Sequence, residues 1–208
     1  ELTVAEKDVV HPALAAAVLR PYWQETVPQQ PPCPPLKRDV SCDLAIIGGG
    51  AGGVLVAMQA LRQATTPLRI VMIEPRSVLA QGVAYATTHG EHLLNVPAAR
   101  MSAFDDRPED FLDYVVTTTP PGGPERASLA HAFIERRRYG EYLRVRLAEA
   151  IAASPAQLQV VHDRVAELEP RSDGATLRLA RHGELQAAGV VLAVGNTPKP
   201  LPARGAPQ

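Results

Sequence analysis

The 208-residue sequence is poor in cysteine, in net charge and in long apolar runs. Its two cysteines, Cys33 and Cys42, are too few for a disulfide scaffold and do not have the spacing of a zinc site, so no metal site is expected. The formal net charge of −1 gives no reason to expect nucleic acid or an anionic membrane as the main partner. No apolar run approaches the roughly 20 residues that span a bilayer, and the stretch 13–19 is too short for a secretory signal. We therefore expect a soluble, cytoplasmic protein.

Proline is concentrated near the two ends of the sequence. The run 28–35 predicts an extended linker, because each proline ring fixes its own φ and disfavours helix in the preceding residue. Ahead of it, Pro12 suits the first position of a short helix that ends near Leu19 and needs a surface to dock on. These signals divide the sequence into an N-terminal helical extension (1–27), a proline-rich linker (28–40), one domain (41–196) and a C-terminal linker or tail (197–208).

The first part of this domain switches between the periodicities of strands and helices. Residues 43–47 form a short apolar run that is typical of a strand buried on both faces. A run of glycines follows, and then apolar residues at helical spacing from Val54 to Leu61. A second buried strand is predicted at 68–74. This order predicts a strand–helix–strand unit with a right-handed crossover between parallel strands.

The rest of the domain contains further strands, two helices and one long irregular segment. Residues 81–106 have neither periodicity, which in a compact domain indicates a ligand-binding loop or a mistaken assignment. Helices are expected at 108–116 and 139–151. Strands are expected at 158–162, 164–168, 175–180, 184–188 and 190–194. Short turns join the middle three, which we interpret as an antiparallel meander.

Gly48, Gly50 and Gly53 form the pattern G-x-G-x-x-G. Alone the pattern is weak, since glycine-rich turns are common, but its place between a strand and a helix is typical of a dinucleotide site. Gly48 would permit the sharp turn, Gly50 would let a pyrophosphate approach the backbone, and Gly53 would let the helix pack closely. The amides at the helix start, that of Ala51 among them, would hold the anion without a lysine. No G-K-[ST] follows, which argues against a P-loop nucleotidase.

Glu74 ends the second predicted strand, 21 residues after Gly53. A carboxylate there can accept hydrogen bonds from both hydroxyls of an adenosine ribose and would repel a 2′-phosphate. By itself such an acid is often only solvated, but in register with the glycines it favours FAD or NAD over NADP. The antiparallel excursion then favours FAD, because a simple NAD domain continues with helical crossovers.

Six segments of the domain share a pattern with known flavoproteins: IIGGGAGG (46–53), LRIVMIEPR (68–76), GVAY (82–85), HLLNVPAARMSAF (92–104), RYGEYL (138–143) and VLAVGN (191–196). They resemble the bacterial FAD-NAD(P)-binding family and, more broadly, the FAD half of flavoproteins related to glutathione reductase and the N-hydroxylating monooxygenases. The Leu-Leu-Asn-Val-Pro and Arg-Tyr-Gly segments are the specific ones. The resemblance implies an α/β, Rossmann-like FAD-binding domain at 41–196, with helices on both faces of a parallel sheet and a three-stranded antiparallel β-meander.

The resemblance also implies roles for individual residues. Val165 would present its backbone to the adenine, and Gly195 would close over the flavin-side phosphate or the ribityl chain. Val194 stands where threonine is usual in these flavoproteins, so a side-chain hydrogen bond is missing there. Three residues of the long irregular segment are further expected contacts of the cofactor: Asn95, Arg100 and Ser102.

The remaining polar residues suggest no catalytic group. The histidines are scattered over different elements and are interpreted as structural or exposed. Arg138 is interpreted as part of a solvated helix start, with phosphate steering as the alternative, and Tyr139 and Tyr142 as core residues. In a flavoenzyme the isoalloxazine carries the chemistry, so the absence of a nucleophile is expected.

Two functions remain open at this point. The first is the FAD-binding portion of a flavin-dependent, NAD(P)H-linked oxidoreductase of monooxygenase-like type. The sequence has no second glycine fingerprint, so the NAD(P)H site would lie on a second polypeptide or a missing domain. The alternative is a non-catalytic dinucleotide-binding scaffold or interaction module. The sequence does not identify a substrate.

Overall fold

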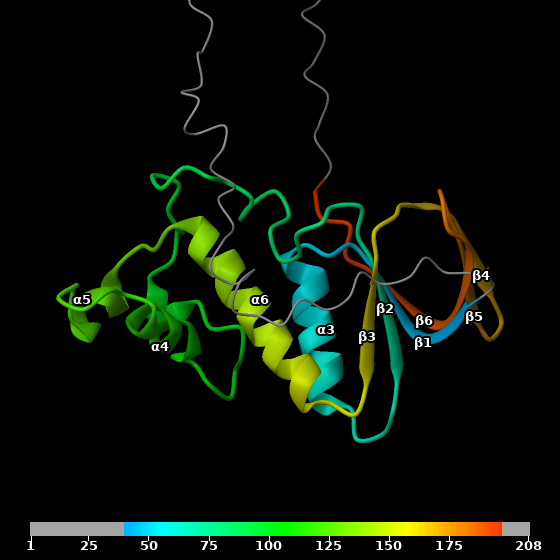
Figure 1. Cartoon of the computed structure of the whole chain (residues 1–208), viewed down its shortest axis with the longest axis horizontal. Coiled ribbons are helices and arrows are strands. Elements are labelled where there is room, and N and C mark those ends of the chain that lie inside the picture. Colours follow the sequence, from blue (N-terminus) through cyan, green and yellow to red (C-terminus); the bar gives the residue numbers. More distant parts are fainter. Residues whose placement is uncertain (1–39, 197–208) are drawn as a thin grey trace, which may run out of the picture. The chain divides into compact units, whose positions relative to one another are not determined.

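The structure is a computed structural model that describes residues 40–196. The predicted N-terminal extension (1–27), the predicted linker as far as residue 39 and the predicted tail (197–208) lie outside the described residues. The described strands are β1 (Val40–Ile47), β2 (Arg69–Ile73), β3 (Gln157–Val161), β4 (Val165–Arg171), β5 (Gly174–Leu179) and β6 (Gly183–Leu192). They form one six-stranded sheet in the order β3-β2-β1-β6-β5-β4 (Figure 1). The first four are parallel to one another, whereas β5 and β4 are antiparallel to their neighbours.

The described helices are α3 (Ala51–Gln63), α4 (Asp110–Thr117), α5 (Arg126–His131) and α6 (Arg136–Ala153), with a single 3₁₀ turn, η1 (Ala98–Arg100). They gather on one side of the sheet (Figure 1). The chain steps from β1 to β2 to β3 in one direction, and right-handed crossovers in one direction place their helices on the same face. The expected helices at 108–116 and 139–151 correspond to α4 and α6. None of the helices at 40–196 is long and apolar enough to cross a lipid bilayer.

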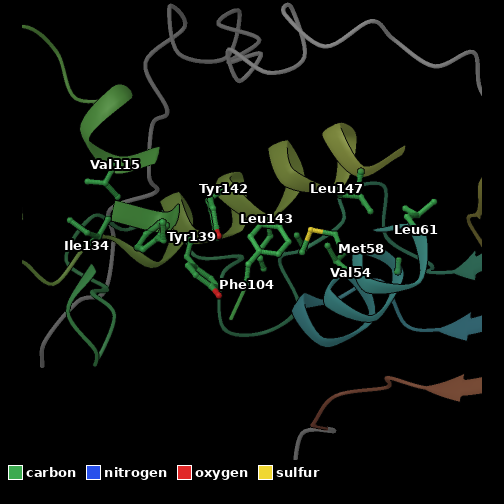
Figure 2. Close-up of a cluster of buried hydrophobic side chains, with 14 of the residues drawn as sticks. Val54, Met58, Leu61, Phe104, Val115, Ile134, Tyr139, Tyr142, Leu143 and Leu147 are labelled. Atoms are coloured by element: carbon green, nitrogen blue, oxygen red, sulfur yellow. The ribbon is translucent and has the colours of Figure 1, made fainter. Parts of the chain in front are cut away.

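The larger core lies between this face of the sheet and the helices. Val54, Met58 and Leu61 follow one another at helical spacing on α3 and are buried. They point toward Leu143 and Leu147 of α6 (Figure 2). This packing holds α3 against the sheet, so that its first turn stands at the carboxyl end of β1.

The opposite face of the sheet has a smaller core. It contains Ala45, Val71 and Ile73 together with Leu177 and Leu185 from β5 and β6. The connection from β3 to β6 passes back across β1, so a right-handed path must run on this face. In the described residues β4 and β5 provide that cover. The Rossmann-like fold class is confirmed, but helices cover one face and the meander covers the other, in place of helices on both.

The last strand differs from the expectation in one respect. The predicted strands 184–188 and 190–194 are a single strand, β6. Its first half pairs antiparallel with β5, from Gly183 to Ala187, and β6 also pairs parallel with β1 along its length. The strand does not turn between its two halves, because Gly189 keeps its register with Leu44 of β1. The third strand of the meander is therefore also the last parallel strand.

Candidate dinucleotide-binding site

The turn between β1 and α3 depends on two glycines for its shape. Gly48 has a φ of +107°, and a Cβ added to it would lie 2.3 Å from the carbonyl oxygen of Ala193. A Cβ added to Gly53 would lie 1.8 Å from the carbonyl oxygen of Gly48. Neither position has room for a side chain. These contacts agree with the sharp turn and the close helix packing expected of these two residues.

Gly50 is enclosed in a different way. It is the residue before α3, and a Cβ added to it would lie 3.5 Å from the Cα of Gly82. Gly82 has a φ of +52°, which favours glycine. Gly82 was not among the residues expected at the site. Its signal in the sequence is a glycine that follows the strand-end acid, within the GVAY segment. The backbone at Gly82 thus forms a wall beside the glycine turn.

Within residues 40–196, no side chain caps Gly50, and the first turn of α3 contains no acidic residue. The first backbone bond of the helix runs from the amide of Val54 to the carbonyl oxygen of Gly50, at 3.0 Å. The amides of the first turn, Ala51 among them, have no acceptor within the helix, and they carry the positive end of its dipole. This arrangement fits a diphosphate, which would be held by backbone N–H groups alone.

Glu74 follows β2 and is half-buried against the glycine turn. Its Oε2 accepts a hydrogen bond from the amide of Gly49 at 2.8 Å, and its Oε1 accepts one from the amide of Arg76 at 3.0 Å. The alternative interpretation, a freely solvated acid, does not fit these bonds. Each carboxylate oxygen has a second lone pair, so both could accept hydrogen bonds from a ribose diol while keeping these partners.

The segment that follows Glu74 is tied to the same turn. The amide of Ala80 donates to the carbonyl oxygen of Gly49 at 2.8 Å, and the Nη1 of Arg76 donates to the carbonyl oxygen of Gly82 at 3.0 Å. Ala80 is fully buried and has a φ of +64°, a strained backbone conformation for a residue with a Cβ. Such a conformation persists only where the surroundings hold it. We call residues 79–85 the crevice loop.

Val165, the residue expected at the adenine, starts β4 and is half-buried. It comes shortly after β3, whose last residue, Val161, accepts a hydrogen bond from the amide of Glu74 at 3.0 Å. The structure therefore places the start of the meander on the side of the glycine turn where Glu74 lies. This agrees with an adenine-side position for Val165, whose contact with a cofactor stays a prediction.

Asp163 is a buried acid that sequence reasoning missed. It is 1% exposed, and its carboxylate accepts hydrogen bonds from the amides of Arg164 at 2.7 Å and Arg181 at 2.9 Å. The Nδ1 of His182 lies 2.6 Å from its Oδ2. Burial by itself would raise the pKa of Asp163, but these partners outweigh it and lower the pKa to about 2. Asp163 thereby fixes the turn before Val165 to the turn between β5 and β6.

Gly195 lies just past β6, beside the glycine turn between β1 and α3. The amide of Ala193 donates to the carbonyl oxygen of Ile47 at 2.8 Å, which keeps the end of β6 beside Gly48. A Cβ added to Gly195 would meet no atom within 4 Å. Val194 is 65% exposed. The position expected at the flavin-side phosphate is therefore open in the described part of the chain.

The expected contacts in the irregular segment are less closely connected to the turn. The Oγ of Ser102 donates to the carbonyl oxygen of Arg107 at 2.6 Å and accepts from the amide of Phe104 at 3.1 Å, so this hydroxyl shapes a local turn. Asn95 and Arg100 are exposed. The contact of these three residues with a cofactor stays a prediction.

Arg138, Tyr139 and Tyr142 were not expected at the cofactor, and each has a structural contact within the domain. Arg138 donates to the Oγ1 of Thr118 at 2.8 Å, at the end of α4, which does not favour phosphate steering. Tyr139 and Tyr142 are buried, as expected of core residues. The hydroxyl of Tyr142 donates to the Oδ2 of Asp110 at 2.7 Å, and burial raises the pKa of this tyrosine to about 12.

Comparison with known proteins supports this fold. A search of the curated proteins found no match. Among solved structures, a closed form of cyclohexanone monooxygenase is 16% identical, with a TM-score of 0.53 over 78% of this chain and 28% of that chain. A thioredoxin reductase from Gloeobacter violaceus is 17% identical, with a TM-score of 0.47 over 80% of this chain and 38% of that one. NikD, an amino acid oxidase essential for nikkomycin biosynthesis, is 17% identical in its open form, with a TM-score of 0.44 over 75% of this chain and 52% of that one.

The chain thus spans about half or less of the length of these structures. The model of the FAD-NAD(P)-binding family matches residues 45–197, which include the glycine turn, Glu74, Val165 and Gly195. This chain belongs to the FAD-NAD(P)-binding family.

Proposed function

We propose that this chain is the FAD-binding part of a flavin-dependent, NAD(P)H-linked oxidoreductase of monooxygenase-like type, acting in the cytoplasm. The proposal rests on one observation. Glu74 accepts a hydrogen bond from the amide of Gly49 in the glycine turn, while the backbone amides at the start of α3 remain open. A diphosphate and a ribose diol are the two groups of an adenosine dinucleotide that such a site could bind side by side.

Different residues of the chain would bind different parts of the cofactor. The first-turn amides of α3 would hold the diphosphate, Glu74 the adenosine ribose, and the backbone at Val165 the adenine. Gly195 would lie along the flavin side of the diphosphate. When bound, FAD would accept a hydride from a nicotinamide and pass electrons on to oxygen or a substrate. The protein would orient the cofactor and supply its electrostatic surroundings.

The proposed NAD(P)H site would lie on another domain or polypeptide. Two observations support this. The sequence has one glycine fingerprint. The chain also spans only 28% of the cyclohexanone monooxygenase that it resembles in fold. The substrate would be bound with that further part.

A titration of the full chain with FAD tests the cofactor. We expect yellow protein, and we expect Gly50→Ala to raise the Kd for FAD about tenfold, equivalent to about 1.4 kcal/mol. The added methyl group would occupy the approach to the backbone while keeping an ordinary contact distance of 3.5 Å from Gly82, so the fold should remain intact.

Gly189→Ala, within β6, is the matched control. Its added Cβ would lie 3.7 Å from the nearest atom, an ordinary contact, and its Kd should stay within about twofold of the parent value. Colourless protein that cannot be reconstituted with FAD would contradict the proposal.

NAD(P)H oxidation separates the enzyme from the alternative scaffold. We expect the FAD-loaded chain to be inactive alone and to become active with a co-purifying polypeptide that carries a second glycine fingerprint. Flavin-loaded protein that remains inactive with every co-purifying partner would favour a non-catalytic scaffold.

A further inference from the structure

The Arg-Tyr-Gly segment at 138–140 has no place in the cofactor site described above, yet it lies at the start of α6, the longest described helix. Its glycine is buried against the crevice loop. A Cβ added to Gly140 would lie 3.3 Å from the Cβ of Tyr85 and 3.4 Å from the carbonyl oxygen of Ala80. Glycine at this position therefore lets the crevice loop lie directly on the helix.

The neighbouring side chains of α6 support the same loop. The rings of Tyr139 and Tyr85 lie 5.0 Å apart between centroids. Tyr139 in turn packs edge-on against Phe111, at 5.1 Å, and Phe111 is fully buried in the core. The Nη1 of Arg144, one helical turn beyond Gly140, donates to the carbonyl oxygen of Leu79 at 3.4 Å. Helix α6 thus contacts the crevice loop at both ends of the loop, at Leu79 and at Tyr85.

The other side of the crevice loop faces the glycine turn. Ala80 donates to Gly49, and Gly82 lies against Gly50. The loop is therefore held between two rigid elements, α6 and the β1–α3 turn. A shift of the loop away from α6 would move the wall at Gly82 relative to the amides at the start of α3.

We propose that Tyr139 and Gly140 are positioning residues of the FAD site, which hold the crevice loop at the distance from Gly50 that a bound diphosphate requires. The inference rests on the proposed binding of FAD. It assigns the Arg-Tyr-Gly segment to cofactor affinity, through the crevice loop, without a contact between the segment and the cofactor.

Gly140→Ala is the decisive variant, because its two expected effects have opposite signs. Alanine favours a helix interior over glycine by about 1 kcal/mol, so the free energy of unfolding without FAD should be unchanged or higher. The added methyl group is closer to the Cβ of Tyr85 than ordinary contact allows, so the loop must shift there by a few tenths of an ångström. We expect the Kd for FAD to rise about tenfold.

Tyr85→Ala is the second variant, and it removes the support from the loop side while leaving α6 intact. Its ring is half-buried, so the fold should tolerate the change, and the Kd for FAD should again rise. Gly189→Ala, within β6, is the control for a glycine-to-alanine change away from the loop and the glycine turn, because its added Cβ would keep an ordinary distance of 3.7 Å from the nearest atom. Hydrogen exchange adds a direct readout: FAD should protect the amides of 80–85 in the parent protein and protect them less in both variants.

The outcomes separate this inference from the proposed function. If the parent chain does not bind FAD, the proposed function fails and the inference fails with it. If the parent binds FAD and both variants bind it equally well, the inference alone fails. A Gly140→Ala protein whose affinity falls only in proportion to lost stability would also overturn it, because the glycine would then support the fold and not the site.

Discussion

At the scale of single residues, the glycines of the β1–α3 turn differ in what an added methyl group would meet. At Gly53 it would overlap a backbone carbonyl oxygen, at Gly50 it would make an ordinary contact, and at Gly52 it would meet nothing within 4 Å. The turn thus combines a residue required for close packing with two positions, Gly50 and Gly52, that leave room for a methyl group. The pattern predicted the roles of Gly48 and Gly53, because strand–turn–helix geometry alone dictates them.

The first prediction follows from this difference. Gly53→Ala should lower the free energy of unfolding by about 3 kcal/mol, because the 1.8 Å overlap with the carbonyl oxygen of Gly48 forces α3 away from β1. Gly52→Ala should leave stability unchanged or raise it by up to about 1 kcal/mol. Urea denaturation measures both, with the midpoint shifting at constant slope. Equal stability of the two variants would show that α3 does not approach β1 so closely.

At the scale of elements, the sequence predicted the strands and the two long helices where apolar periodicity was strong. It could not predict that 184–188 and 190–194 are one strand, because the two halves of β6 have different neighbours and therefore different patterns of burial. Nor could it predict that the meander covers the second face of the sheet. That depends on how β4 and β5 meet Val71 and Ile73 of β2, a long-range contact that leaves no local pattern.

The candidate site likewise contains residues that the sequence predicts and residues that it does not. The glycines and Glu74 are read from local spacing, whereas Gly82 enters the site only because the crevice loop folds back on the turn. Asp163 carries no signal either, since its partners Arg181 and His182 are distant in sequence. Ser102, whose contact with the cofactor stays a prediction, also organises its own turn, a role that residue type alone does not reveal.

Asp163 yields a prediction about how two turns are joined. Its folded-state pKa of about 2 lies below the usual value near 4, so the ionised form stabilises the fold. That contribution is fully present above about pH 4 and is lost as the pH falls toward 2. Asp163→Asn places an amide donor among existing donors and should cost about 2 kcal/mol at neutral pH.

The measurement is urea denaturation of both proteins between pH 2 and pH 7. The stability difference between the parent and Asp163→Asn should shrink as the pH falls from about 4 to about 2. Asp173, which is exposed in the turn between β4 and β5, provides the matched control, and Asp173→Asn should behave like the parent. A difference that stays constant with pH would mean that Asp163 is not held as a charged group.

At the scale of the whole molecule, the candidate site joins parts of the chain that are far apart in sequence. The glycine turn and Glu74 come from the first strand–helix–strand unit, the crevice loop rests on α6, and Val165 begins the meander. A ligand bound at this site would contact the folded arrangement and no single segment of the unfolded chain. Its binding free energy should therefore appear as stability of the described domain as a unit.

This coupling makes thermal unfolding a test of which part of FAD is recognised. At a free concentration about a hundred times its Kd, FAD should stabilise the protein by about 2.7 kcal/mol. For a domain of this size, that corresponds to a rise in Tm of about 5–10 °C. FMN lacks the adenylate, so it cannot use Glu74 or the backbone at Val165. At the same free concentration as FAD, it should therefore produce a far smaller shift in Tm. Equal shifts with FAD and FMN would place recognition on the flavin, and Glu74 would then have no part in binding.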